Sequence, residues 1–165
     1  MKIYVTGLGV VSGIGIGVSE NIEALQQGKH GIGKVTLFPT ALDVPVSEVK
    51  RSNEELKQLI SLPPQRTVSR TALLGMIAAK EAMKDAGLTP PLRIGFISAT
   101  SVGGMDLSEH FYESFKKNPG QGRLREVISH DCGASTELIA SYLGINDFIL
   151  SLIHISEPTR HSLIS

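Results

Sequence analysis

The chain has 165 residues, of which 41% are hydrophobic and 19% are charged. Its 16 basic and 16 acidic residues cancel, so it lacks the excess positive charge with which proteins bind nucleic acid. The apolar stretch at the amino terminus is short and broken by glycines, which excludes a signal peptide or a transmembrane span there. The single cysteine, Cys132, has no partner for an internal disulfide. We therefore expect a cytoplasmic domain, or part of one, that binds neither nucleic acid nor a membrane.

The first elements predict the opening of an α/β unit. Residues 3–6 are mostly β-branched and predict a strand, and a glycine-rich turn follows them. The next segment places Val18, Ile22 and Leu25 on one face of a helix. A strand, a glycine turn and a helix in this order are also typical of dinucleotide-binding proteins, in which the turn cradles phosphate.

Glycine spacing argues against a nucleotide site. In a Gly-x-Gly-x-x-Gly pattern that starts at Gly7, the third glycine is replaced by Ser12. The turn of the short-chain dehydrogenases does not fit either, because five residues separate Gly7 from Gly13. No acidic residue ends a second strand about twenty residues further on, where a ribose hydroxyl would need it. A nicotinamide-dependent oxidoreductase therefore stays open only as an alternative.

The middle of the chain predicts a short strand and two helices. Residues 44–49 alternate like a strand, and Ser52 with Glu55 forms a capping box at the start of a short helix. A long helix follows from about residue 68; it is apolar almost all round over residues 72–79, so we expect it to be buried. Its charged end, residues 80–85, is expected to face water.

Two further strands and two helices complete the pattern. Residues 93–99 form a nearly continuous apolar strand, as expected when both faces of a parallel sheet are covered. A helix with Leu107, Phe111 and Phe115 on one face comes next. We then expect Ser135 to cap another helix, a glycine to end it, and a buried strand to start near residue 146.

Three blocks of sequence, in this order, resemble the β-ketoacyl-acyl-carrier-protein synthases. The first is Val-Thr-Gly-Leu-Gly-Val-Val-Ser at residues 5–12, followed by Gly-Lys-x-Gly-Ile at 28–32. The second is the Arg-Thr-Ala-Leu-Leu-Gly helix from residue 70 to its Asp-Ala-Gly-Leu end. The third is Arg-Ile-Gly at residue 93 with Gly-Gly-Met at 103–105. The resemblance covers residues 1–149.

This resemblance implies a thiolase-like α/β fold, layered helix-sheet-helix-sheet-helix in the complete family, of which the chain holds most of the first half. It implies a 3-oxoacyl-acyl-carrier-protein synthase of fatty-acid or polyketide biosynthesis. In this family an acyl group moves to a cysteine, malonyl carrier protein loses carbon dioxide, and the carbanion attacks the acyl thioester. No metal or organic cofactor is implied. The implied partners are a phosphopantetheine-bearing acyl carrier protein and, in the complete protein, a second copy.

The cysteine of the family lies in a Thr-Ala-Cys-Ser-like turn that opens a helix, where the helix dipole favours the thiolate. This chain has no such turn, so we assign no catalytic, cofactor-binding or metal-binding residue and expect the chain to be inactive. After residue 149 it continues as Leu-Ser-Leu-Ile-His-Ile-Ser-Glu-Pro-Thr-Arg at 150–160, which resembles a translated sequencing adapter. We therefore expect residues 1–149 to be a partial synthase and residues 150–165 to be a non-native tail, with a divergent natural terminus as the alternative.

The cysteine and histidines present here do not inherit the catalytic roles. Cys132 precedes the helix that comes before the family's nucleophile, so we expect it to be a small packing residue. His130 is expected to point away from it. His30 in a glycine loop and His110 on a polar helix face are expected to be solvated. The remaining histidines, His154 and His161, lie in the expected tail.

A catalytic motif and a functional alternative also have to be considered. Ser47 and Lys50 fit a Ser-x-x-Lys nucleophile pattern, which we interpret as chance because their surroundings alternate like a strand. A non-catalytic subunit similar to a chain-length factor remains the second functional alternative, because such subunits lack the cysteine.

Overall fold

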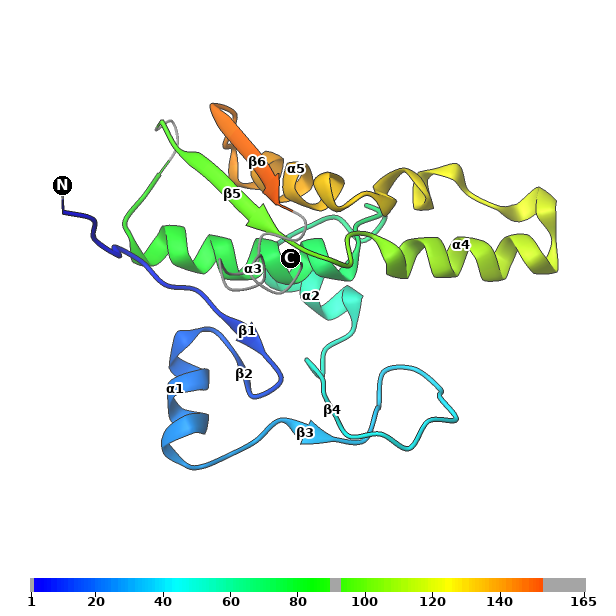
Figure 1. Cartoon of the computed structure of the whole chain (residues 1–165), viewed down its shortest axis with the longest axis horizontal. Coiled ribbons are helices and arrows are strands. Elements are labelled where there is room, and N and C mark those ends of the chain that lie inside the picture. The colour runs from blue at the N-terminus through cyan, green and yellow to red at the C-terminus, as the bar shows by residue number, and fades with distance from the viewer. Residues whose placement is uncertain (1, 90–92, 153–165) are drawn as a thin grey trace, which may run out of the picture. The chain divides into compact units, whose positions relative to one another are not determined.

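The computed structural model describes residues 2–89 and 93–152 of the chain (Figure 1). They form two compact units. Unit 1 contains the described residues up to 66 together with residues 73–89, and unit 2 contains residues 67–72 and the described residues from 93 onward. Each unit mixes helices and strands, in agreement with the expected α/β class.

Unit 1 begins with a small hairpin and not with the expected strand at residues 3–6. Ile3, Tyr4 and Val5 are 86%, 73% and 81% exposed and lie outside every strand of the described chain. Pairing begins later, where β1 (Val11–Ser12) and β2 (Gly15–Ile16) run antiparallel. The prediction was wrong because β-branched residues favour a strand only where a neighbouring strand supplies hydrogen bonds.

The helix after this hairpin, α1 (Val18–Gln26), buries an unexpected face. Ile22 and Leu25 are 49% and 67% exposed, whereas Asn21 and Ala24 are buried. The side-chain amide of Asn21 donates to the carbonyl oxygens of Gly15 and Gly17, so the buried polar group is satisfied. Hydrogen bonding to the hairpin, which periodicity does not reveal, has decided how this helix is rotated.

Helix α2 (Asn53–Leu59) has the expected capping box. The Ser52 hydroxyl accepts a hydrogen bond from the Glu55 backbone N–H, and the Glu55 carboxylate accepts one from the Ser52 N–H at 2.7 Å. This backbone hydrogen bond and the Arg51 side chain hold the pKa of Glu55 below its usual value. Leu56 is fully buried on the inner face of the helix.

Helix α3 (Arg70–Asp85) is buried as expected over its apolar part. The side chains of Ala72, Leu73 and Met76 are inaccessible to solvent. Ser69 accepts a hydrogen bond from the Ala72 N–H at the start of the helix, and Gly87 adopts the expected left-handed conformation after its end, with φ 65°. Among the residues that the structure describes, the helix thus supplies two of the three largest fully buried apolar side chains, Leu73 and Met76.

The charged end of α3 does not simply face water, as we had expected. Glu81 and Asp85 accept hydrogen bonds from the backbone N–H groups of Val10, Val18 and Leu8. The polypeptide before the hairpin therefore lies against α3.

A long loop connects β3 (Ile32–Gly33) to β4 (Val46–Ser47), which pair antiparallel. The expected strand at 44–49 is thus reduced to two residues. The Glu48 carboxylate anchors the loop by accepting hydrogen bonds from the N–H groups of Thr36 and Leu37 and from the Thr36 hydroxyl. These bonds, the Thr36 hydroxyl first, lower the pKa of Glu48.

Unit 2 is built on two parallel strands, β5 (Gly95–Ala99) and β6 (Phe148–Leu152), which lie side by side in Figure 1. The register pairs Ile97 with Leu150, and these two side chains are 59% and 39% exposed. The strand expected at 93–99 is confirmed over Gly95–Ala99, but it is not covered on both faces. β6 continues three residues past Ile149, and the rest of the expected tail, residues 153–165, lies outside the described residues.

The crossover between these strands contains α4 (Met105–Lys117), three short 3₁₀ turns, η1 (Pro119–Gln121), η2 (Leu124–Glu126) and η3 (Ile128–His130), and then α5 (Cys132–Leu143). In α4 the rings of Phe111 and Phe115 stack at 5.6 Å between centroids. The cap of α5 is Asp131, whose carboxylate accepts from the Gly133 N–H, and not Ser135 as expected. Ser135 is instead buried one turn further on.

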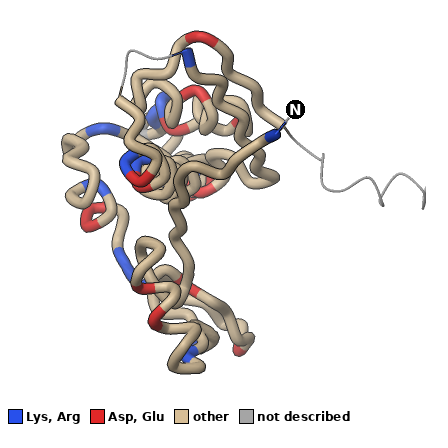
Figure 2. Tube along the Cα trace, turned by 90° about the vertical axis from the view of Figure 1, so that its left-hand side faces the viewer, with Lys and Arg blue, Asp and Glu red and all other residues tan. Residues whose placement is uncertain are grey.

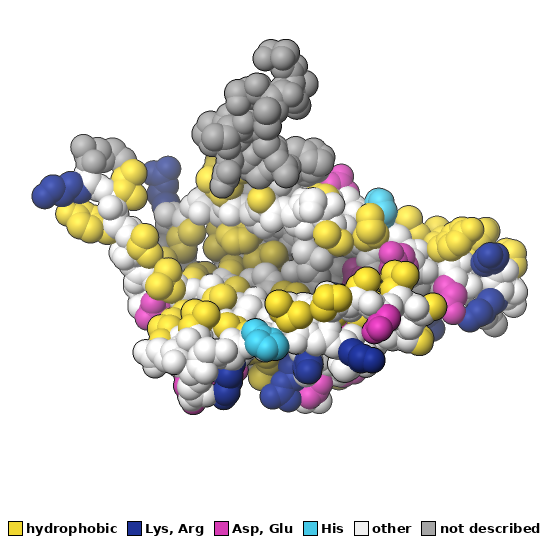
Figure 3. Space-filling view, turned by 60° about the horizontal axis from the view of Figure 1, so that its bottom comes forward, with side chains coloured by type: hydrophobic (Ala, Val, Ile, Leu, Met, Phe, Trp, Pro, Cys, Tyr) yellow, Lys and Arg dark blue, Asp and Glu magenta, His cyan; other side chains and the backbone are white. Residues whose placement is uncertain are grey.

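Charges of both signs are interspersed along the tube in Figure 2. Hydrophobic side chains are scattered over the face seen in Figure 3. Within the described residues, none of the helices combines the length and the apolar character needed to cross a bilayer.

We predict that Ser52→Ala lowers the free energy of unfolding by about 1 kcal/mol, because it removes the acceptor for an otherwise unpaired N–H at the start of α2. Chemical denaturation measures the change. Ser141→Ala, which alters an exposed serine inside α5, is the control and is expected to be nearly neutral. Equal effects of both substitutions would contradict the role of the capping box.

We predict that acid releases the loop between β3 and β4. Because the pKa of Glu48 is lower in the folded than in the unfolded protein, its stabilising contribution is fully present above the ordinary pKa of a glutamate. It is lost as the pH falls through the lower pKa of the folded state. NMR chemical shifts of the Thr36 and Leu37 amides measure the transition. Glu48→Gln is expected to abolish it, whereas Asp43→Asn, in an exposed ion pair of the same loop, is expected to leave it in place.

Candidate functional site

The candidate site lies in unit 2, where the loop after β5 meets the turn before α5. Gly103 has φ 57°, and a Cβ atom there would lie 2.7 Å from the His130 carbonyl oxygen and 3.0 Å from the Cys132 nitrogen. Gly104, the residue before α4, donates its N–H to the same His130 oxygen at 3.4 Å. Glycines at both positions therefore allow the starts of α4 and α5 to approach backbone to backbone.

His130 uses this proximity to contact α4. Its Nδ1 lies 2.8 Å from the hydroxyl oxygen of Ser108, and both residues are at the surface. Within the described part of the chain, no hydrogen bond joins the His130 ring to the Cys132 thiol. The described hydrogen-bond partner of the His130 ring is therefore Ser108 and not Cys132.

Cys132 is the first residue of α5 and its thiol is free and partly exposed. A thiol at a helix amino terminus is a plausible nucleophile in principle. Here the carboxylate of Asp131 already occupies one of the free N–H groups of the first turn. Nucleophilic catalysis by a thiol usually relies on a neighbouring base, and the described contacts of Cys132 include the Asp131 cap but no histidine.

The other residues singled out in the sequence are not brought together. His30 is exposed in a loop of unit 1, and His110 is exposed on α4, where it adds slightly to the lowering of the Glu113 pKa that Lys117 mainly causes. Ser47 lies in β4 and not at the start of a buried helix, as a Ser-x-x-Lys nucleophile would. His154 and His161 are outside the described residues.

Two residues of this site were not anticipated from the sequence. Ser108 contacts His130, and Asp106 in the first turn of α4 accepts a hydrogen bond from the Arg70 backbone N–H at 2.8 Å. The other oxygen of the Asp106 carboxylate is buried without a partner. An acidic residue directly after Gly-Gly-Met indicates the start of a helix, here α4. The sequence around Asp106 does not reveal that its side chain accepts a hydrogen bond from the first residue of another helix, α3.

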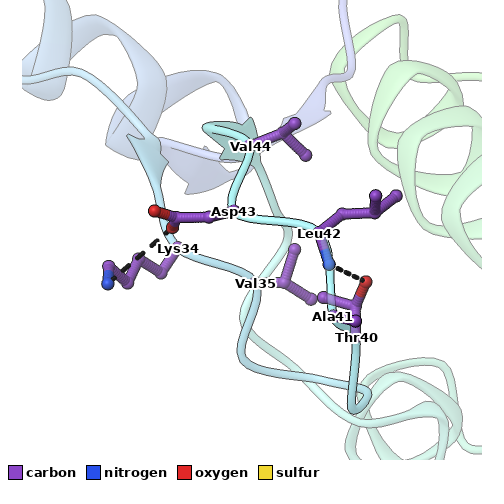
Figure 4. A pocket seen from close by; sticks show the side chains of 7 residues that line it. All are labelled: Lys34, Val35, Thr40, Ala41, Leu42, Asp43 and Val44. Carbon is purple, nitrogen blue, oxygen red and sulfur yellow. Dashed lines mark hydrogen bonds and ion pairs between the residues drawn. The ribbon is translucent and has the colours of Figure 1, made fainter.

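No metal-binding cluster of three histidine, cysteine or acidic side chains occurs within the described ranges. A hollow of about 230 Å³ lies in the loop between β3 and β4, and Figure 4 shows the side chains around it. Its charged residues, Lys34 and Asp43, pair at 3.8 Å and are almost fully exposed. The other lining residues are Val35, Thr40, Ala41, Leu42 and Val44. This set offers no nucleophile with a base.

The glycine turn near the amino terminus is not open to a phosphate either. Gly7 and Gly9 pack so closely on Ala78 and Ala82 of α3, and on Ala86 just after it, that side chains would collide there. The start of α1, where a dinucleotide would place its pyrophosphate, is occupied by the Glu81 carboxylate. A helix terminus that already holds an anion argues against the nicotinamide alternative.

Comparison with known proteins agrees with the resemblance found in the sequence. The family model of the beta-ketoacyl synthase N-terminal domain matches residues 1–145. The 3-oxoacyl-[acyl-carrier-protein] synthase 2 of Coxiella burnetii is 31% identical over 122 residues, which are 68% of this chain and 28% of the relative.

Two solved structures share the fold. The ishigamide ketosynthase/chain length factor has a TM-score of 0.76 and 24% identity, over 90% of this chain and 39% of the other. A ketosynthase bound to a hexaketide, in complex with its type II PKS acyl-carrier protein, has a TM-score of 0.66 and 22% identity, over 89% of this chain and 36% of the other. Both are thiolase-like ketosynthases.

The chain spans only 27–42% of the length of the curated relatives it matches. Over that span the match covers both units and nearly all of the described elements. The chain belongs to the β-ketoacyl synthase family, and its residues 1–145 match the N-terminal domain of that family.

Proposed function

We propose that the chain is the amino-terminal part of a 3-oxoacyl-acyl-carrier-protein synthase and that the complete protein forms carbon–carbon bonds between acyl and malonyl thioesters. The observation that carries the proposal is the family match over residues 1–145. The relatives that it resembles are 3-oxoacyl-acyl-carrier-protein synthases and polyketide ketosynthases. Both groups carry out condensing acyl transfer.

The chemistry needs a thiolate and proton-handling groups that the described residues do not bring together. The acyl group passes to a cysteine, loss of carbon dioxide from malonyl carrier protein leaves a carbanion, and the carbanion displaces the cysteine from the acyl thioester. In the described chain, Cys132 has Asp131 beside it, and His130 is hydrogen-bonded to Ser108. We therefore propose that the 165-residue chain does not condense acyl groups by itself.

The proposed partner is a phosphopantetheine-bearing acyl carrier protein. A structural neighbour in complex with its own type II carrier protein supports this partner. A second copy of the chain, as in the complete synthase, is also part of the proposal. The acyl product, a fatty acid or a polyketide, depends on pocket residues that we do not assign.

A chain-length-factor-like subunit is the second candidate function. The solved ketosynthase/chain length factor that resembles this chain supports it. The intact gene separates the two functions, because a synthase has a cysteine at the turn before the next helix and a chain-length factor does not. The second candidate gains support if the complete protein is inactive alone but needed by a partner synthase.

We predict that the 165-residue chain incubated with acyl and malonyl carrier protein forms no 3-oxoacyl product, as measured by mass spectrometry of the carrier protein. The complete protein is expected to form it and to release carbon dioxide. In the complete protein, Cys132→Ala is expected to leave the rate unchanged, since Cys132 is proposed to be a packing residue. A mass increase on the short chain that disappears in Cys132→Ala would contradict the proposal.

We also propose that residues 150–165 are a non-native tail. The strand pairing of Leu150 to Leu152 with β5 does not argue against it, because backbone pairing in a sheet tolerates many apolar residues. We predict that genomic sequence across codon 150 continues β6 into a turn with a cysteine and then a helix. The bases that encode 150–160 are expected to match the adapter exactly. A genomic read that reproduces the present residues would overturn this proposal.

A further inference from the structure

Helix α1 has no cap of its own. Its first residue, Val18, follows Gly17, which has φ 95° and no side chain with which to accept a hydrogen bond. The acceptor comes from another helix: Oε1 of Glu81, in α3, accepts from the Val18 N–H at 2.7 Å. A carboxylate at this place both satisfies an unpaired donor and interacts favourably with the helix dipole.

The same carboxylate also holds the chain on the other side of the hairpin. Oε2 of Glu81 accepts from the Val10 N–H at 3.0 Å, and the Gly17 N–H donates to the Val10 carbonyl at 2.8 Å. One side chain therefore joins both ends of residues 10–18. One helical turn further along α3, Asp85 accepts from the Leu8 N–H at 2.9 Å.

Residues 7–18 contain no charged side chain. The groups that this segment offers to Glu81 and Asp85 are backbone N–H groups and the amino terminus of α1. Hydrogen bonds to a charged acceptor are stronger than neutral ones, and those to Val10 and Val18 are partly shielded from water. The two carboxylates are therefore strong and specific attachments for an otherwise apolar segment.

The segment also touches α3 through two glycines. Gly7 and Gly9 approach the helix closely but contribute no side chains, and Ile3, Tyr4 and Val5 before them are exposed. Asn21 fastens the hairpin to α1 through the carbonyls of Gly15 and Gly17, so that these parts are expected to move together.

We propose that Glu81 and Asp85 form a carboxylate clasp that holds residues 7–18 on α3 as a single strap, with Glu81 serving as the N-cap of α1. The strap opens as a unit when Glu81 loses its acceptor oxygens, while α3 stays folded. This inference concerns a conformational device of unit 1 and does not rest on the proposed condensing activity.

Amide hydrogen exchange of the whole chain tests the clasp. In Glu81→Ala the Val10 and Val18 amides are expected to exchange at least about tenfold faster. Alanine is the best helix former, so the α3 amides of residues 73–80 are expected to keep their protection. Glu81→Gln keeps one acceptor oxygen and is expected to give a smaller increase. Lys84→Ala, an exposed position on the same helix, is the matched control and is expected to change nothing.

Two results would overturn the proposal. Unchanged exchange at Val10 and Val18 in Glu81→Ala would show that the glycine–alanine packing holds the segment without the carboxylates. Equally faster exchange throughout α3 and the segment would show that Glu81 stabilises the unit as a whole and that no separate strap exists. If Glu81→Ala does not fold, the milder Glu81→Gln decides by the same two criteria.

Discussion

The close approach of two glycines to a helix is the constraint on which unit 1 depends. Gly7 and Gly9 lie against Ala78 and Ala82 of α3 and against Ala86 just after it, at a separation that a single added methyl group would disturb. This approach brings backbone N–H groups within reach of carboxylates on the same face of the helix, one turn apart. The path of the hairpin and the start of α1 follow from that contact. The glycines of the segment and the alanines that face them are therefore important because their small size permits this close approach.

Unit 2 depends on a different arrangement, a pair of parallel strands connected by a long helical crossover. Parallel strands are usually covered on both faces, and their apolar sequences reflect this. In the described chain, Ile97 and Leu150 are register partners on one face and remain 59% and 39% exposed, while α5 packs against both strands. The apolar pattern of β5 is therefore suited to a more extensive protein than the one described. The relatives, which are more than twice as long, are consistent with that.

The candidate site surrounds the one cysteine of the chain with groups that serve the structure of two helix starts. Cys132 stands at the start of a helix, a position that favours a thiolate in enzymes. Its surroundings are a capping carboxylate and the two glycines of the loop before α4, and the nearby histidine is bonded to Ser108. The glycines have a structural explanation, because they let two helix starts meet. Family membership rests on the order of sequence blocks along the chain and on the shared fold, and it does not rest on these side chains.

Local sequence determined the features that depend on neighbouring residues: the capping box of Ser52 and Glu55, the buried centre of α3, the left-handed Gly87 and the existence of β5. The family was also evident from sequence alone, since block order survives where identity is low. Only the tertiary structure decided that residues 3–6 are unpaired, that Asn21 is buried in place of Ile22, and that Glu81 caps a helix 63 residues earlier. Glu81 lies far from α1 in the sequence, whereas Asn21 bonds to carbonyl groups only four and six residues before it, in a backbone conformation that the folded hairpin sets. Propensity and periodicity report what a segment favours, whereas the partner that satisfies its hydrogen bonds is chosen by the fold.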